Sequence, residues 1–445
     1  MGEGDTGSKG AGRGATAGKP AWHHRAVIVP DPGDLQDLVR ELHHQSTPWL
    51  PAGLASRLDW GAPLRQPCEV VSAARLRGIL EHSPGDFILR VAAGTPLQEI
   101  QEELARHRQW LALDPPLTTA PAATMDGPAA AGGSIGGLVA RGLAGGYRQR
   151  YLGVRDQLIG IRVLRADGVA ARAGGKVVKN VAGYDLMRLF TGSWGSLGLI
   201  SELTLRAMPL PQHRAGLLLQ GPAPLLVARV DALLRAGLTP ERLDLWNPAL
   251  AAAAGLEAEA QLLVAVASVS AEGLAEQLAA IGGSGLQELA SRPCAADELA
   301  ALLAAARPQP PAPGTPDPAA WLLRLGATPN RVAELLARQE LGSLAVDLAA
   351  SSGLGMAWGP ATSLSPAQVM ALRQHCRALG GHLTVLRQPP EAAAADNALT
   401  AWEDAPSRAL MEAVKSRFDP KLQLAPGRLP GVARPARAAQ APASP

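Results

Sequence analysis

Glycines, lysines and an amide are concentrated between residues 174 and 209, and this stretch holds the residues best suited to chemistry. Its first part joins a glycine turn to Lys176, Lys179 and Asn180, and its second part spaces three glycines three residues apart, at Gly192, Gly195 and Gly198. Glycine lets bare backbone approach a flat or anionic group, and successive backbone N–H groups in such turns form concave phosphate sites. A nearby lysine adds positive charge. The stretch therefore predicts a site for a phosphate-bearing ligand.

A second glycine-rich loop lies upstream, at residues 131–140, and reads Ala-Gly-Gly-Ser-Ile-Gly-Gly-Leu-Val-Ala. Its glycines suit an anion at the N-terminus of a helix, where N–H groups are unpaired and the helix dipole is positive. A dinucleotide fingerprint is the competing interpretation, because Gly133 and Gly136 match two of its three glycines. That fingerprint needs a preceding apolar strand. Residues 121–128 do not read as one, so the anion site is the preferred interpretation.

Together these two loops resemble the PCMH-type FAD-binding domain of the vanillyl-alcohol oxidase superfamily. The resemblance covers residues 27–211 and a short C-terminal piece, residues 415–428. Residues 174–185 are similar to the E-type subunits of glycolate dehydrogenases, also called glycolate oxidases, which act beside a D-type FAD subunit and an F-type iron–sulfur subunit. The resemblance implies that the chain oxidises glycolate, a 2-hydroxy acid, to glyoxylate by hydride transfer to flavin. Electrons would then pass to the iron–sulfur partner.

The resemblance also implies which residues hold the cofactor. They come from a turn after an expected strand near Leu50, from the two glycine-rich stretches and from the loop between them: Pro51, Gly53, Ser56, Gly133, Ser134, Gly136, Gly137, Gly153, Asp156, Lys179, Gly183, Gly195, Gly198 and Ile200. The first turn departs from the family pattern, because Leu54 and Ala55 stand where relatives often have further glycines. Covalent attachment in relatives uses a His or Cys in the first loop or in the cap domain. Residues 49–67 contain neither, so noncovalent FAD is expected.

Flavin-dependent oxidation of a 2-hydroxy acid needs a group that accepts the hydroxyl proton, a cation for the carboxylate and a dry pocket. By resemblance, His382 and Arg387 lie on the cap strand that brings polar residues to the flavin, and an arginine fork can bind a carboxylate through two hydrogen bonds. They are the predicted catalytic residues. The D-type subunit carries a Gly-Glu-His run at this place, whereas this chain has Thr-Val-Leu-Arg at residues 384–387.

Because of that departure, two further functions stay open. The chain could be a non-catalytic FAD-binding scaffold that docks the D-type and F-type partners, or a stand-alone FAD-dependent oxidoreductase of another alcohol or 2-hydroxy acid. Single residues also have simpler interpretations. Any one glycine can serve only a tight turn, Lys176 and Lys179 can be solvated surface charges, and Tyr184 can belong to the core.

Composition limits the partners and the compartment. The 445 residues are 47% hydrophobic, and 42 basic residues nearly balance 39 acidic ones, so a nucleic-acid partner is not expected. The three cysteines are far apart and form no CxxC pair, which argues against a metal site and fits a reducing cytoplasm. No apolar run is long enough to cross a bilayer. We therefore expect a cytoplasmic protein without a transmembrane segment. Any association with the inner membrane would be peripheral and would depend on its partners.

The expected fold class is α+β, with a two-part FAD-binding domain, a cap domain and a C-terminal segment that returns to the first domain. Its predicted parts are a disordered tail (1–24), the FAD-binding domain (25–211), the α+β cap or substrate domain (212–388), the returning segment (389–430) and a second tail (431–445). Alanine- and leucine-rich helices alternate with short strands in the cap, which predicts an antiparallel sheet covered by helices. Thr95 is the expected N-cap of a helix with Pro96 at its first position.

Overall fold

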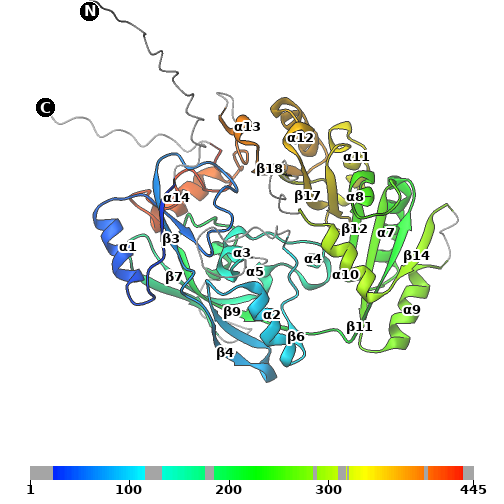
Figure 1. The fold of residues 1–445 in the computed structure, drawn as a ribbon, viewed down its shortest axis with the longest axis horizontal. Helices are drawn as coiled ribbons and strands as arrows, with labels where there is room; N and C mark the ends of the chain where they lie inside the picture. Colours follow the sequence, from blue (N-terminus) through cyan, green and yellow to red (C-terminus); the bar gives the residue numbers. More distant parts are fainter. Residues whose placement is uncertain are drawn as a thin grey trace, which may run out of the picture.

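The structure is a computed structural model that describes residues 24–115, 133–175, 185–283, 288–308, 317, 320–394 and 399–433. Two lobes lie side by side, and the chain passes from the first to the second at β11 and returns at its C-terminal end (Figure 1). Both lobes mix helices and sheets, so the predicted α+β class is confirmed. The predicted domain boundaries themselves stay predictions.

The first lobe contains two main sheets. A parallel sheet has the order β1 (His24–Ile28), β3 (Cys68–Ser72), β2 (Trp49–Ala52). An antiparallel sheet has the order β4 (Ile79–Ser83), β5 (Ile88–Ala92), β9 (Leu199–Arg206), β7 (Leu158–Leu164), β8 (Ala170–Gly174). The shorter β6 (Gln109–Trp110) and β10 (Met208–Pro209) pair with each other.

Helices cover these sheets and carry the loops of interest. They are α1 (Leu35–His44), α2 (Leu97–Arg106), α3 (Ile135–Arg141), α4 (Arg148–Tyr151), α5 (Val154–Gln157) and α6 (Met187–Phe190), with a 3-10 turn η1 (Pro84–Asp86). Apolar residues at helical spacing explain α1, whose Leu35, Val39 and Leu42 are buried. The N-cap of α2 is Pro96 rather than Thr95. The Thr95 hydroxyl instead donates to the carbonyl of Ala92 at 2.7 Å, so it fixes the end of β5.

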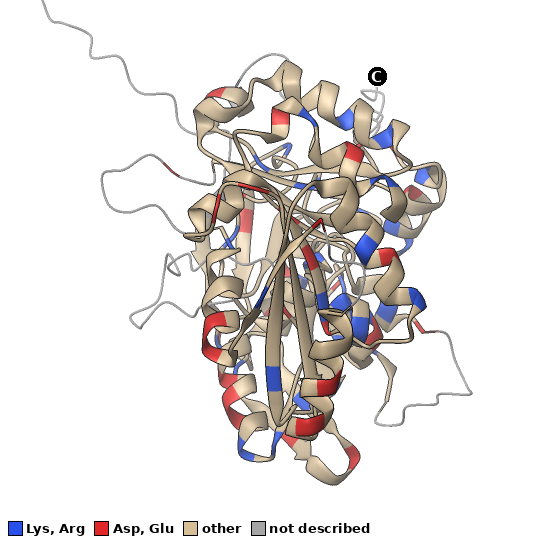
Figure 2. Cartoon of the chain, turned by 90° about the vertical axis from the view of Figure 1, so that its right-hand side faces the viewer, with Lys and Arg blue, Asp and Glu red and all other residues tan. Residues whose placement is uncertain are grey.

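The second lobe is built on one sheet in which every pair of neighbouring strands is antiparallel. Its order is β14 (Ala290–Cys294), β11 (His213–Gln220), β13 (Gln261–Ser268), β12 (Arg242–Trp246), β16 (Ala345–Ala349), β17 (Leu354–Gly359), β15 (Trp321–Gly326), β18 (His382–Arg387). The helices are α7 (Ala223–Arg235), α8 (Pro248–Ala253), α9 (Ala271–Ile281), α10 (Ala296–Ala305), α11 (Val332–Leu336), α12 (Pro366–Ala378) and α13 (Pro390–Ala394), with 3-10 turns η2 (Pro329–Arg331), η3 (Gln339–Leu341) and η4 (Ala361–Ser363). On the face shown in Figure 2, basic and acidic residues are interspersed along these helices.

The last helix, α14 (Arg408–Phe418), packs back on the first lobe (Figure 1). Lys415 fixes it there, because its buried Nζ donates to the carbonyls of Ser196 and Leu424 at 2.7 and 2.8 Å and to Asp419 Oδ2 at 2.6 Å. The following segment runs beside β2, where Leu424 forms a parallel bridge with Trp49. The C-terminal segment therefore completes the wall of the first lobe that contains β2.

The two lobes share apolar and ionic contacts. Trp60 and Leu143 of the first lobe belong to one buried apolar cluster with Trp246, Trp358 and Leu386 of the second. The Gly61 amide donates to the carbonyl of Leu386 at 2.6 Å. Among the described helices, none combines the length and apolarity needed to span a bilayer.

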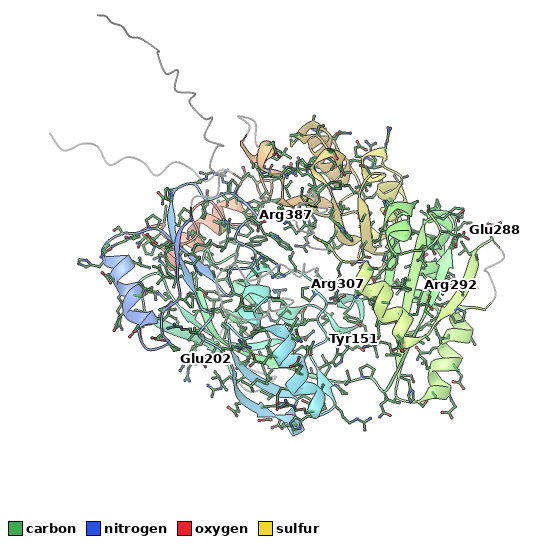
Figure 3. The ribbon with its side chains drawn as sticks, viewed as in Figure 1. Tyr151, Glu202, Glu288, Arg292, Arg307 and Arg387 are labelled. Atoms are coloured by element: carbon green, nitrogen blue, oxygen red, sulfur yellow. The ribbon has the colours of Figure 1, made fainter. Side chains whose placement is uncertain are left out.

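A buried ionic network also crosses the boundary between the lobes. Arg242 donates to Asp244 at 2.5 Å and is also bonded to Asp114 of the first lobe. On the edge of this network, the Tyr151 hydroxyl donates to Glu241 Oε1 at 2.5 Å, and Figure 3 shows Tyr151 at the boundary between the lobes. The network holds α4 against the second lobe.

Candidate functional site

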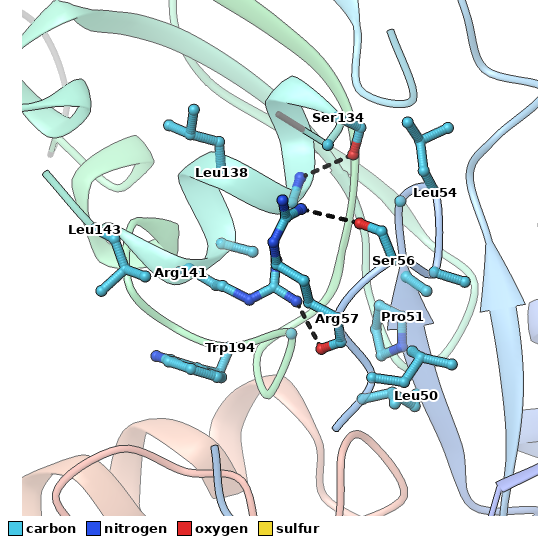
Figure 4. A pocket seen from close by; sticks show the side chains of 18 of the residues that line it. Leu50, Pro51, Leu54, Ser56, Arg57, Ser134, Leu138, Arg141, Leu143 and Trp194 are labelled. Atoms are coloured by element: carbon cyan, nitrogen blue, oxygen red, sulfur yellow. Dashed lines mark hydrogen bonds between the residues drawn. The ribbon is translucent and has the colours of Figure 1, made fainter. Parts of the chain in front are cut away.

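A groove separates the loop after β2 from the N-terminus of α3 (Figure 4). It has about 730 Å³ of empty space and continues into a hollow of about 340 Å³ beneath the turn that leads into β9. The two spaces share part of their lining, namely Pro51, Ala52, Gly53, Gly137, Ala140 and Gly195. We call the two spaces together the glycine groove.

Most residues predicted to hold the cofactor line this groove, although they come from three separate parts of the sequence. They are Pro51, Gly53, Ser56, Gly133, Ser134, Gly136, Gly137, Gly195, Gly198 and Ile200. Gly153 and Asp156 lie elsewhere, in the cleft between the lobes. Lys179 and Gly183 lie outside the described residues, as do Lys176, Asn180 and Tyr184. The cofactor contacts of each residue stay predictions.

The glycines of the groove allow two backbones to meet. A Cβ atom on Gly53 would overlap the Ser134 hydroxyl, and one on Gly136 would lie 2.7 Å from the Cβ atom of Ala93. Real Cβ atoms do not approach other atoms so closely. These glycines therefore close the wall of the groove by direct contact between the loop after β2, α3 and the end of β5.

The hydrogen bonds at the start of α3 show that several of its amides already have partners. The Gly136 amide donates to the carbonyl of Ala93 at 2.8 Å, and the Gly137 amide donates to Ser134 Oγ at 3.2 Å. The Gly153 amide likewise donates to Asp156 Oδ2 at 3.1 Å. Because these donors already have partners within the protein, they are not the free phosphate donors that the sequence motif suggested.

Positive charge in the groove comes from three arginines that the sequence motifs did not indicate, of which Arg57 and Arg428 are buried and Arg141 is half-buried. Arg57 follows the first turn, Arg141 ends α3, and Arg428 belongs to the C-terminal segment; all three line the groove. Arg57 donates to Ser56 Oγ at 2.9 Å, and Arg141 donates to the carbonyl of Arg57 at 2.9 Å (Figure 4). Arg57 and Arg141 lie within or beside the predicted motifs, but nothing in the sequence indicated that they are buried or half-buried.

Burial sets the electrostatics of these arginines. It lowers the pKa of Arg57 and of Arg428 to about 10, against the opposing effect of Asp59. The pKa of Arg141 falls to about 9, first through burial and then through the neighbouring charge of Arg57. All three stay protonated at neutral pH, so the groove carries excess positive charge. The buried Nε of Arg141 has no hydrogen-bond partner among the described residues. An anionic, doubly phosphorylated ligand matches this donor set.

Trp194 lines the groove at the end nearest the second lobe, and the buried Trp60 belongs to the apolar cluster against which Trp194 packs. The guanidinium of Arg141 lies 5.6 Å from the ring centre of Trp60 and 5.8 Å from that of Trp194. Trp194 in turn contacts Trp402, with ring centres 5.7 Å apart. Flat apolar surfaces beside a half-buried cation suit a large conjugated ring system.

Beyond these rings the groove joins a larger cleft between the lobes, with about 1,240 Å³ of empty space. Arg141, Leu143 and Trp194 line both spaces. The charged side chains of this interdomain cleft are Arg141, Arg148, Arg155, Asp156 and Arg324. Arginine dominates, so the cleft favours an anionic ligand.

The two predicted catalytic residues do not line the groove or the cleft. Arg387 is engaged elsewhere, because its guanidinium lies 2.9 Å from Asp317 and 3.7 Å from Asp59, which ties β18 to the first lobe (Figure 3). The role of Arg387 in holding a substrate carboxylate stays a prediction, which this pairing does not favour. His382 opens β18 near Arg324; partial burial lowers its pKa, and the charge of Arg324 lowers it further. Its catalytic role stays a prediction.

Comparison with protein families gives one domain match. Residues 24–174 match the family described as the FAD binding domain. The matched region contains β1 to β8 and includes both walls of the glycine groove up to α3.

Among curated proteins, the chain is similar to the glycolate oxidase subunit GlcE of Escherichia coli (strain K12), with 34% identity over 178 residues, 40% of this chain and 47% of the relative. It is 31% identical over 206 residues to the mitochondrial D-lactate dehydrogenase [cytochrome] of Arabidopsis thaliana, covering 44% of this chain and 34% of that protein. It is 29% identical over 224 residues to the glycolate oxidase subunit GlcD of Escherichia coli (strain K12), covering 50% of this chain and 40% of that protein. The chain thus spans half or less of these relatives.

Among solved structures, the chain resembles alkyldihydroxyacetonephosphate synthase, with a TM-score of 0.60 and 12% sequence identity. The superposition covers 90% of this chain and 75% of that protein. At this identity the likeness concerns the fold, and it extends over both lobes.

Proposed function

Because residues 24–174 are an FAD-binding domain, as the sequence predicted, we propose that the whole chain is an FAD-dependent oxidoreductase acting on the CH–OH group of a 2-hydroxy acid. Glycolate is the proposed substrate and glyoxylate the product. The proposed setting is a glycolate dehydrogenase-type complex, in which a D-type FAD subunit and an F-type iron–sulfur subunit are the partners.

One observation carries the proposal: the glycine groove opens into a cleft rich in arginine. The groove and the cleft share Arg141, Leu143 and Trp194. A cofactor in the groove and an anionic substrate in the cleft would therefore meet at this junction. The names of the similar proteins, glycolate oxidase subunits and a D-lactate dehydrogenase, support a hydroxy acid as the substrate class.

The residues of the groove fit FAD by their chemistry. Arg57 and Arg141 supply charge for the diphosphate, the close approach of Gly53 to α3 leaves bare backbone at the wall, and Trp194 supplies a flat apolar surface. When bound, FAD supplies a two-electron acceptor. The buried apolar cluster that joins the lobes, which includes Trp60 and Leu143, excludes water from one side of the junction.

His382 stays the predicted acceptor of the substrate hydroxyl proton, although it is exposed at the start of β18 and does not line the groove or the cleft. Since burial and Arg324 both lower its pKa, its imidazole is neutral at pH 7 and can take up a proton. Replacing His382 by Gln should lower kcat by about 10²-fold or more. A variant that keeps the kcat of the unaltered chain would remove His382 from the mechanism.

A second candidate function follows from the lining of the cleft. Its side chains include several arginines and one carboxylate, Asp156, but no histidine among the described residues. Asp156 already accepts a hydrogen bond from the Gly153 amide. This arrangement favours the alternative in which the chain retains FAD, binds anions and docks the partner subunits, while a partner performs the oxidation.

Anaerobic reduction separates the two functions. The chain is purified, saturated with FAD and mixed with glycolate with and without a dye acceptor. Bleaching of the flavin absorbance by glycolate, with turnover when the dye is present, is expected for the oxidoreductase. A flavin that stays oxidised, but bleaches once the D-type partner is added, would support the scaffold and contradict the first proposal.

A further inference from the structure

The interdomain cleft contains two arginines whose placement the sequence motifs did not explain. Arg324 lies on β15 between β17 and β18, and Arg148 begins α4 on the opposite lobe. Both line the cleft, and both also line a smaller adjoining hollow beside Met356. The two side chains therefore face the same space from the two lobes.

Arg324 has an unusual environment for a cation. It is half-buried, and its cross-strand neighbours are Met356 on β17 and Thr384 on β18, neither of which carries charge. Within the described chain its side chain makes no hydrogen bond and no ion pair. Its pKa is lowered first by burial and then by the charge of Arg148. Burying a guanidinium without an anion is costly, and a second cation nearby adds to that cost.

Arg148 is held in place by its neighbours along α4. Gln149 donates to the carbonyl of Pro240 at 3.1 Å, and Tyr151 donates to Glu241 Oε1 at 2.5 Å. These two hydrogen bonds fix the short helix α4 to the second lobe. The guanidinium of Arg148 itself has no hydrogen-bond or ion-pair partner in the described parts of the chain. In contrast, other arginines at the lobe boundary are neutralised: Arg242 by two aspartates and Arg214 by Glu241.

We propose that Arg148 and Arg324 form the binding site for the carboxylate of the substrate. This inference rests on the proposed function and names the residues that recognise the acid. A carboxylate between the two guanidiniums would replace their mutual repulsion by charge-assisted hydrogen bonds. The site lies in the cleft that the glycine groove enters at Arg141, so a small acid held there shares the cavity with the groove opening. The role first assigned to Arg387 passes to this pair.

The test is calorimetric titration of the FAD-saturated chain with oxalate, a carboxylate that cannot be oxidised as a 2-hydroxy acid. The variants are Arg324→Gln and Arg148→Gln. Arg235→Gln on α7, an exposed arginine of the same lobe paired with Asp231, is the matched control. Each site variant should raise the Kd for oxalate by about 10-fold or more, as expected for loss of a charge-assisted hydrogen bond. The control should leave the Kd unchanged.

Stability and kinetics complete the test. Since Arg324 has no partner, Arg324→Gln should unfold at the temperature of the unaltered chain or above it; should it fail to fold, the exposed Arg148 still provides the variant. With glycolate, both changes should raise KM far more than they lower kcat. Oxalate binding that does not depend on either arginine, or no oxalate binding at all, would overturn the proposal. Arginine-dependent oxalate binding without flavin reduction by glycolate would keep this site and reject the proposed function.

Discussion

Gly53 and Ser134 are in direct contact across the glycine groove, so close that a Cβ atom on Gly53 would overlap the Ser134 hydroxyl. Gly53 follows β2, and Ser134 is the N-cap of α3, whose side chain accepts from the Gly137 amide. The contact joins the two loops that the sequence placed in one cofactor site. It also explains why the first turn needs a glycine here, independently of any ligand.

Replacing Gly53 by Ala should weaken FAD binding. The added methyl group must displace the Ser134 hydroxyl, with loss of its bond from the Gly137 amide, or push the loop after β2 away from α3. Forced expansion of a tight contact costs about 1–3 kcal/mol. We expect a lower unfolding temperature and a Kd for FAD raised by about 10-fold or more, measured by calorimetry. Gly85→Ala is the control, because a Cβ atom there meets no other atom. Equal FAD affinity in both variants would show that the contact does not shape the groove.

Ala55 should accept glycine with a gain in stability. Its φ of 53° lies in the left-handed region, which residues with a Cβ atom adopt at a cost of about 1–2 kcal/mol. Ala55→Gly removes that cost, although the greater freedom of the unfolded chain offsets part of it. Thermal unfolding should show a small increase in stability. Ala62→Gly, at a position without a positive φ, should instead lower the unfolding temperature. If Ala62→Gly proved more stable than Ala55→Gly, the backbone of Ala55 would not be strained.

Stability should decline with rising pH because of the buried ionic network. Burial, and then the charge of Asp244, raise the pKa of Asp347 well above its ordinary value of 3.8. The folded state therefore binds this proton more tightly than the unfolded state does. The stability that results is fully present below pH 3.8 and is lost as the pH rises through the folded pKa.

Asp347→Asn removes this titration and keeps the acceptor for Trp246 Nε1, which lies 3.1 Å from Asp347 Oδ1. The variant should match the unaltered chain near pH 4 and exceed its unfolding free energy at pH 8, by about 1.4 kcal/mol for each pKa unit of the shift. Asp86→Asn, at an exposed position, is the control. An Asp347 variant that is less stable than the unaltered chain at pH 8 would contradict the assignment.

Lys415 should be essential for docking the C-terminal segment. Lys415→Met leaves Asp419 buried without its cation, and removing one partner of a buried pair costs about 3–5 kcal/mol. Hydrogen exchange should show residues 419–428 opening, and FAD should dissociate more readily because Arg428 lines the groove. Arg417→Met, on the exposed side of the same helix, should change neither. Unaltered exchange in the Lys415 variant would argue against this role.

The fold class and the residues that gather at the groove could be predicted because the glycine motifs resemble those of a known family, and such motifs are local signals in the sequence. It did not predict that Arg57 and Arg141 are buried or half-buried, since arginine is usually exposed and its burial depends on distant segments. Arg324 was missed because its meeting with Arg148 depends on how the lobes pack. The ion pairs of Arg387 with Asp59 and Asp317 could not be predicted, because both partners are distant in sequence. The prediction of Thr95 as the N-cap of α2 was wrong, because its hydroxyl donates to the carbonyl of Ala92 at the end of β5.

The most direct test of the account is the FAD content of the purified, folded chain, measured from the absorbance of flavin released by acid and by titration with added FAD. The account predicts a yellow protein that holds stoichiometric, noncovalent FAD and releases it completely. A colourless protein with the expected secondary structure that fails to bind added FAD would contradict the assignment of the glycine groove as the cofactor site.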